Sequence, residues 1–244
     1  MKKTLTAAFA IAGLAGMAMA TIETPAAGYA DFTGTSSAQY VCNPFTSFTN
    51  SAPTLGDIDG SALSSTDYIK VIDNAGNLVF RATWTTVGGV TGWYDTNDAL
   101  RNGYALARGN AIQFYGPSAA KLVIAGYIGA ANTFTLTANV QNWIGNTSPL
   151  AKTVGNIVPS SFNTRKDAAY FVNPSTGTLT QAAYINATQA AKAGVSAGWY
   201  QKADIASQAA LQAATSIDNW AIPSGQGFLL MPGTSGVTVT IPAY

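Results

Sequence analysis

Short runs of β-branched and aromatic residues, separated by turn residues about every ten positions, dominate the chain beyond its first residues. This pattern is typical of strands rather than of helices. The expected strands cover residues 68–72, 78–84, 111–115, 121–127, 133–140, 169–172, 178–185, 227–231 and 237–241. Strands of this length and spacing predict an all-β (mainly β) protein built as a sandwich or barrel.

Two turns and one other segment complete the pattern. Residues 73–77 (DNAGN) and 173–177 (NPSTG) each join two expected strands, and their Asn and Gly residues favour the positive φ of a tight hairpin. Residues 203–215 are rich in Ala, Gln and Leu, and Asp204 is placed to cap a helix there. We therefore expect two hairpins and one short helix.

Several short motifs recur in the same order in both halves of the chain. Ala27-Gly28-Tyr29 returns as Ala125-Gly126-Tyr127, Gly92-Trp93-Tyr94 as Gly198-Trp199-Tyr200, and Arg108-Gly109-Asn110-Ala111-Ile112 meets Ser224-Gly225-Gln226-Gly227-Phe228. The recurrence predicts two tandem diverged β-sandwich or barrel-like units, at 21–124 and 125–244, with the short helix inserted in the second. Whether the two units share one core stays open.

The first twenty residues have the pattern of a secretory signal peptide. Lys2 and Lys3 precede an apolar stretch at 7–17, and Ala18-Met19-Ala20 forms a small-residue cleavage site. No later segment has the ~18 uninterrupted apolar residues of a membrane helix. We therefore expect cleavage after Ala20, no transmembrane segment in the processed chain, and a secreted protein that is extracellular or on the cell surface.

Charge is sparse and nearly balanced. The chain has 12 basic and 11 acidic side chains, and cleavage removes two of the basic ones. A neutral chain is a poor partner for nucleic acid, so none is expected. Only 9% of residues are charged, against about 25% in typical domains. Two interpretations remain: the chain packs against copies of itself or other surface proteins, or it is solvated by hydroxyl and amide groups.

The residues of common catalytic sites are scarce. The chain has no histidine, which excludes Ser-His-Asp and Cys-His systems, and Glu23 is its one glutamate. Among the aspartates, Asp67 recurs in the second half, as Asp167, but an Asp that precedes a strand more often caps a turn. The expectation is that the protein is not an enzyme and that it needs no cofactor.

Asp57-Ile58-Asp59-Gly60-Ser61 resembles the beginning of a calcium-binding loop. A full EF-hand loop carries a Glu at its twelfth position, which here is Tyr68. Asp57 and Asp59 are therefore either ligands of a possible calcium ion or polar turn residues.

Four aromatic residues, Trp93, Tyr94, Trp199 and Tyr200, admit two interpretations. They either form an exposed platform on which polysaccharide rings stack, or they fill the same core pocket in each unit. Cys42 is the one cysteine, so it has no partner for an intrachain disulfide. At the first offset of the repeat it falls on Val140, which favours a buried, inert thiol.

Three motifs follow one another along the chain: Asn43-Pro44-Phe45, then Gly92-Trp93-Tyr94, then Pro223-Ser224-Gly225-Gln226-Gly227-Phe228. In these motifs the chain resembles a loosely defined group of secreted bacterial β-rich proteins of the Verrucomicrobia and Planctomycetes type. The resemblance implies β-structure and a surface location. With the export signal and the sparse charge, it leads us to expect a self-assembling structural protein of the extracellular matrix or cell surface. The alternative is a carbohydrate-binding module that uses exposed tryptophans.

Overall fold

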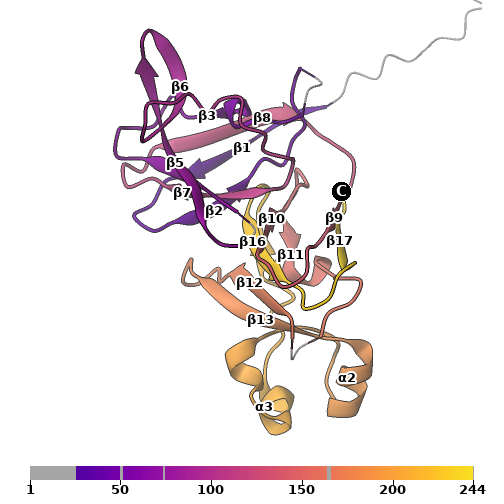
Figure 1. The fold of residues 1–244 in the computed structure, drawn as a ribbon. Coiled ribbons are helices and arrows are strands. Elements are labelled where there is room, and N and C mark those ends of the chain that lie inside the picture. Colours follow the sequence, from indigo (N-terminus) through magenta and orange to yellow (C-terminus); the bar gives the residue numbers. More distant parts are fainter. Residues whose placement is uncertain (1–25, 50–51, 74, 164–165, 244) are drawn as a thin grey trace, which may run out of the picture.

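The computed structural model describes residues 26–49, 52–73, 75–163 and 166–243, so the expected signal peptide lies outside the described residues. Antiparallel strands account for most of the regular structure, which confirms a mainly β protein. The chain forms an upper and a lower group of sheets in Figure 1, and two short helices, α2 (Ala187–Ala193) and α3 (Gln208–Ala213), lie at the lower end.

The first half of the chain forms two sheets. Its strands are β1 (Ala27–Thr33), β2 (Gln39–Cys42), β3 (Ile58–Asp59), β4 (Tyr68–Ile72), β5 (Leu78–Val87), β6 (Val90–Asp95), β7 (Ala111–Tyr115) and β8 (Lys121–Tyr127). One sheet has the order β2-β7-β4-β5-β6 and the other the order β1-β8-β3. Buried residues of both sheets, such as Ile124 and Phe114, form one hydrophobic cluster between them.

The second half has its own sheets and its own hydrophobic cluster. Its strands are β9 (Asn132–Thr135), β10 (Asn142–Gly145), β11 (Lys152–Thr153), β12 (Ala168–Val172), β13 (Leu179–Ile185), β14 (Gly198–Gln201), β15 (Ala221–Ile222), β16 (Gly227–Met231) and β17 (Thr238–Ile241). The five-stranded sheet has the order β10-β16-β12-β13-β14, while β17 pairs with β9 and β11 with β15. The buried residues of this half cluster separately from those of the first.

The strand orders of the two five-stranded sheets correspond position by position. β2, β7, β4, β5 and β6 match β10, β16, β12, β13 and β14, and the pair β1 and β8 matches β9 and β17. A short 3-10 helix precedes β4 and β12 at the same point of each half, as η1 (Leu55–Asp57) and η2 (Val154–Asn156), each with a capping box. The two halves therefore share a topology.

The recurrence of Ala-Gly-Tyr has a different cause from the one expected. β1 and β8 are neighbouring strands, and Gly28 pairs directly with Gly126. Both glycines lie against Phe45, where an added Cβ would come within 2.8 Å and 2.7 Å of its side chain. At Gly126 an added Cβ would also lie 2.3 Å from the Thr46 carbonyl oxygen. The motif therefore recurs because two facing strands must both make room for the same segment, Phe45-Thr46. The second copy of the motif lies in β8, which pairs with β1 along its length to Tyr127.

Most of the expected strands appear, and four of them, β4, β7, β8 and β16, have the expected bounds. The expected strand at 133–140 ends early, at Thr135, and β1, β2, β6, β10 and β14 were not expected. The expected helix at 203–215 is interrupted: η3 (Lys202–Ile205) is followed by α3, whose N-cap is Ser207. Helix α2 was missed although Asn186 and Gln189 form a capping box at its start.

Candidate functional site

The two recurring tryptophans are core residues. Trp93 and Trp199 are both fully buried. The indole Nε1 of Trp93 donates to the carbonyl oxygen of Ile58 at 2.9 Å, and that of Trp199 donates to the carbonyl oxygen of Ile157 at 2.7 Å. Each ring therefore fills an equivalent pocket and satisfies its single donor there.

The tyrosines that follow them are also buried. The Tyr94 hydroxyl donates to the carbonyl oxygen of Val90 at 2.9 Å, and the Tyr200 hydroxyl donates to that of Ser196 at 2.9 Å. Burial raises the pKa of Tyr200 above its ordinary value, and the charge of Asp218 adds to this rise. None of the four aromatic residues expected to bind a ligand presents a ring face to solvent, so the arrangement matches the core interpretation.

Asp57 and Asp59 use their carboxylates in two separate turns. Asp57 accepts from the Thr54 backbone N–H at 2.7 Å and from the Ser47 hydroxyl at 3.0 Å. Asp59 accepts from the backbone N–H and the hydroxyl of Ser61, at 2.8 Å and 3.0 Å. No cluster of three or more His, Cys, Asp or Glu residues occurs among the residues that the structure describes. The arrangement matches the turn interpretation of this loop.

Cys42 is fully buried where the two halves meet. Burial raises the pKa of its thiol, and the positive charge of Arg108 opposes this only in part. Its structural counterpart is Gly145 and not Val140, because Val41-Cys42 pairs with β7 as Ile144-Gly145 pairs with β16. A Cβ at Gly145 would lie 2.4 Å from the Cys42 sulfur, so the contact requires a glycine.

The contacts between the halves are reciprocal. Val41 of the first half forms a β-bridge with Gln226 of the second. The counterparts of these two residues, Ile144 and Asn110, form the equivalent bridge in the opposite direction. Tyr40 and Trp143 hold equivalent positions and stack on each other, with ring centroids 4.4 Å apart and an interplanar angle of 3°. Equivalent residues thus meet equivalent residues, which is the signature of an approximate two-fold axis.

Arg108 reinforces this junction on one side. Its guanidinium donates to three carbonyl oxygens, those of Pro44, Ala130 and Thr147, each at 2.8 Å. The three carbonyls belong to the first half, the connection between halves and the second half. Arg108 therefore ties together three segments, and desolvation lowers its pKa.

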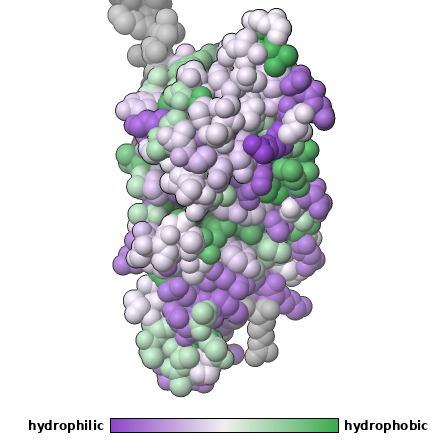
Figure 2. All heavy atoms as spheres, turned by 90° about the vertical axis from the view of Figure 1, so that its left-hand side faces the viewer, coloured by the Kyte–Doolittle hydropathy of each residue, from purple (hydrophilic) through white to green (hydrophobic). Residues whose placement is uncertain are grey.

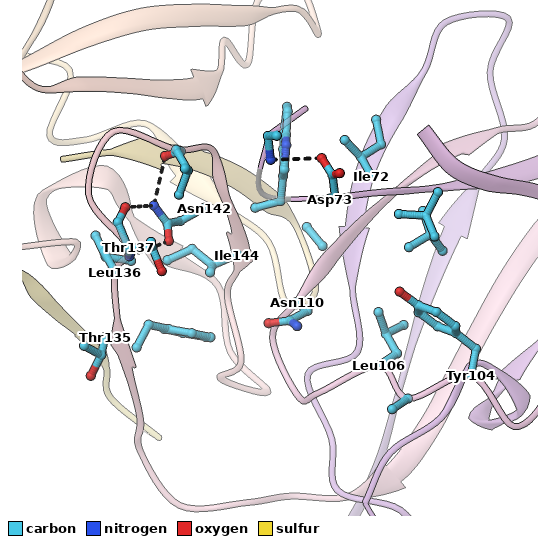
Figure 3. A pocket seen from close by; sticks show the side chains of 18 residues that line it. Ile72, Asp73, Tyr104, Leu106, Asn110, Thr135, Leu136, Thr137, Asn142 and Ile144 are labelled. Atoms are coloured by element: carbon cyan, nitrogen blue, oxygen red, sulfur yellow. Dashed lines mark hydrogen bonds between the residues drawn. The ribbon is translucent and has the colours of Figure 1, made fainter. Parts of the chain in front are cut away.

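A groove of about 670 Å³ lies where the β4–β5 hairpin of the first half approaches β9 and β10 of the second. We call it the first groove. Figure 3 shows Asn110, Thr135 and Tyr104 around it, from three different segments of the chain. Asn142 also borders it but is committed to the protein, since its side chain bonds to the backbone of Thr137.

A second groove, of about 590 Å³, lies where the β12–β13 hairpin of the second half approaches β1 and β2 of the first. Five of its lining residues have counterparts in the first groove, as the strand registers show. The pairs are Thr33 and Thr135, Thr35 and Thr137, Gln39 and Asn142, Tyr40 and Trp143, and Gln226 and Asn110. The approximate two-fold axis therefore relates the two grooves. Sequence reasoning missed both, because neither is formed by one half alone.

The tip of the β5–β6 hairpin forms a third feature, which we call the arm (residues 85–91, TTVGGVT). Every residue of the arm is exposed. β5 pairs with β4 only as far as Ala82, and within the arm β5 and β6 pair only with each other. The arm thus projects from the sheet with two unpaired edges (Figure 1).

The surface of the face shown in Figure 2 is largely pale in its upper part, which marks residues of intermediate hydropathy rather than strongly hydrophilic ones. This agrees with the low charged fraction of the chain. Among the described residues, no helix has the length and apolar character required to cross a membrane. No family model, curated protein or solved structure matches the chain.

Proposed function

We propose that this chain is an exported structural protein of the cell surface or extracellular matrix, without enzymatic activity, that assembles with copies of itself into a filament or layer. We further propose that its halves are diverged copies of one β-sandwich unit. The single observation that carries the proposed assembly is the arm, a bare two-stranded ribbon with no covering segment among the described residues.

The composition of the arm favours pairing with another strand. Apart from Gly88 and Gly89, its residues are threonine and valine, which are strong strand formers. Natural proteins protect open strand edges with charges, prolines, bulges or covering segments, and the arm has neither a charged residue nor a proline. A lone two-stranded hairpin is also only marginally stable in water. An added strand would therefore stabilise the arm.

The outer edges of β6 and of its counterpart β14 are covered, which makes the arm distinctive. On β6, Tyr94 forms a β-bridge with Leu100, and the Arg101 backbone N–H donates to the Trp93 carbonyl oxygen at 2.7 Å. On β14, Tyr200 is bridged in the same way by Ser216. The chain covers its sheet edges at these points and leaves the arm open.

A second copy of the chain is the occupant that the arm fits. The arm has no charge with which to attract a charged partner, and two uncharged ribbons meet without repulsion. The arm has two bare edges, so the β5 edge of one arm can add to the β6 edge of the arm in the next copy. This head-to-tail contact leaves one edge free at each end and does not close, whereas pairing of two like edges gives only a two-fold dimer. Assembly beyond the dimer is therefore the expected behaviour.

The test compares two lysine substitutions at equally exposed valines. Val90 in the arm and Val158 in a loop are each 51% exposed. The protein purified after export is expected to form particles larger than a dimer in light scattering and extended or layered particles in negative-stain microscopy. V90K is expected to reduce this assembly about tenfold or more, because each junction would bury a charge, while V158K leaves it unchanged.

Two outcomes would overturn the assembly proposal. One is a wild-type protein that stays monomeric or dimeric at high concentration. The other is equal assembly of V90K and the wild type.

Polysaccharide binding by the recurring tryptophans loses its basis because these rings are buried, so carbohydrate recognition would require another surface.

A further inference from the structure

We infer that the first groove is a binding site for a neutral oligosaccharide, a role separate from the proposed assembly. The groove has a volume of about 670 Å³, within the range of roughly 300–1,000 Å³ typical of small-molecule sites. It lies at the junction of the two halves, where such sites commonly occur in proteins.

Polar groups without a partner converge on this groove. The Asn110 amide and the hydroxyls of Tyr104, Thr135 and Thr137 line it, and none of them has a hydrogen-bond partner among the described residues. Asn110 and Thr135 are exposed, so a ligand can reach them. Amides and hydroxyls both donate and accept, which suits the hydroxyl groups of a sugar.

The charge of the groove excludes an acidic ligand. Asp73 is the one charged residue among those that line it. Its carboxylate accepts from the backbone N–H groups of Asn77 and Ala75, at 2.7 Å and 2.9 Å. These hydrogen bonds lower the pKa of Asp73, and the bond from the Asn77 backbone contributes most. A fixed negative charge repels anions, and a carboxylate already bonded to backbone N–H groups offers little to attract a cation. A neutral, hydroxyl-rich ligand is therefore the best fit.

Apolar surface in the same groove matches the C–H faces of sugar rings. Trp143 is half-buried and borders the groove. Its orientation is set by stacking on Tyr40 and by the bond from its Nε1 to Gln141 Oε1 at 2.9 Å. Phe134 and Val79 add further apolar surface. The indole is therefore in place before a ligand arrives, which lowers the entropic cost of binding.

The second groove serves as an internal comparison. Two of its counterpart residues use their polar groups within the protein: the Thr35 hydroxyl donates to the Ser37 carbonyl oxygen at 2.8 Å, and the Gln226 amide donates to the Tyr40 carbonyl oxygen at 2.9 Å. Thr137 and Asn110, which hold the equivalent positions in the first groove, have no such partner among the described residues. Binding is expected at one site per chain, in the first groove.

The test measures binding of five neutral hexasaccharides by isothermal titration calorimetry: maltohexaose, cellohexaose, xylohexaose, mannohexaose and chitohexaose. At least one is expected to bind with a stoichiometry near one. The double variant N110A/T135A is expected to weaken that binding about tenfold or more, because two hydrogen-bonding side chains are lost. Neither side chain has a hydrogen-bond partner in the part of the chain that the structure describes, so folding should be unaffected, and thermal unfolding checks this.

The matched control is T33A, which makes in the second groove the change equivalent to T135A and should leave the affinity within about twofold of wild type. Hexagalacturonate, an acidic probe, is expected not to bind. The inference is overturned if none of the five neutral probes binds, or if N110A/T135A binds as well as the wild type. Because the arm and the first groove share no residue, V90K tests assembly and N110A/T135A tests binding independently.

Discussion

The two halves of the molecule share one topology but differ in one connection. This connection joins β5 to β6 in the first half and β13 to β14 in the second. In the first half, β5 and β6 continue past the sheet and meet at Gly88-Gly89, both with positive φ, as a tight two-residue hairpin requires. In the second half, β13 ends at Ile185 and helix α2 intervenes before β14 begins at Gly198. The first half therefore leaves two strand edges bare where the second half places a helix.

What the halves keep in common are the positions where a buried polar group needs a partner. The backbone N–H of Trp93 donates to Asn102 Oδ1 and that of Trp199 to Asp218 Oδ1, each at 2.8 Å. The residue type differs, but an acceptor oxygen is present in both. Connections exposed to solvent carry no such requirement, because water satisfies their backbone. The halves therefore differ most where water, and not the protein, bonds to the backbone.

The largest expected effect comes from the matched pair of core tryptophans. Trp93→Ala and Trp199→Ala should each lower the free energy of unfolding by about 3–5 kcal/mol, because each empties a filled pocket and leaves a buried carbonyl without its donor. Urea unfolding followed by circular dichroism measures both. If either variant lost less than about 1 kcal/mol, the equivalence of the two pockets would fail.

The junction between the halves should be the next most sensitive place. Gly145→Ala would put a Cβ 2.4 Å from the Cys42 sulfur and 2.8 Å from the Gln226 carbonyl oxygen. Overpacking of this kind costs about 1–3 kcal/mol, measured as the fall in the free energy of unfolding. Gly103→Ala is the control, since nothing lies within 4 Å of a Cβ there. Equal losses in the two variants would argue against close packing at the junction.

A smaller effect, dependent on pH, should distinguish Asp67 from an exposed aspartate. Burial tends to raise the pKa of Asp67, but hydrogen bonds from Ser118 and Ser64 outweigh it and lower the pKa below its ordinary value. Because the folded-state pKa lies below the unfolded value of about 3.9, the carboxylate stabilises the fold above that pH. This contribution is lost as the pH falls through the folded-state pKa.

Asp67→Asn should therefore lower the free energy of unfolding at neutral pH by about 1–2 kcal/mol and weaken its dependence on pH in the acid range. Asp59→Asn, at an exposed carboxylate in a turn of the same half, is the control and should have a smaller effect. Unfolding curves at several pH values between about 3 and 7 provide the measurement. An unchanged pH dependence in Asp67→Asn would contradict the assignment.

Two of the strands that sequence predicted with the right bounds have residues that alternate strongly, whereas β16 is a continuous apolar run. β4 and β7 have the expected bounds because β-branched and aromatic side chains fill alternate positions. β10 reads Asn-Trp-Ile-Gly and was missed, since its strand conformation depends on pairing with β16, distant in sequence. The candidate grooves were missed for the same reason, because each takes its walls from both halves.

By itself, the sequence determined that the described chain is mainly β and placed most turns, because side-chain alternation and turn residues act locally. It also determined the near-neutral charge of the chain. Only the tertiary structure decided which repeats are equivalent. The two copies of Ala-Gly-Tyr lie on facing strands, so they are not equivalent positions of the two halves. The two copies of Gly-Trp-Tyr are equivalent, because the tryptophan of each fills the same pocket in its half. Whether a residue is buried, bonded or free depends on strands far away along the chain, and no local pattern records that.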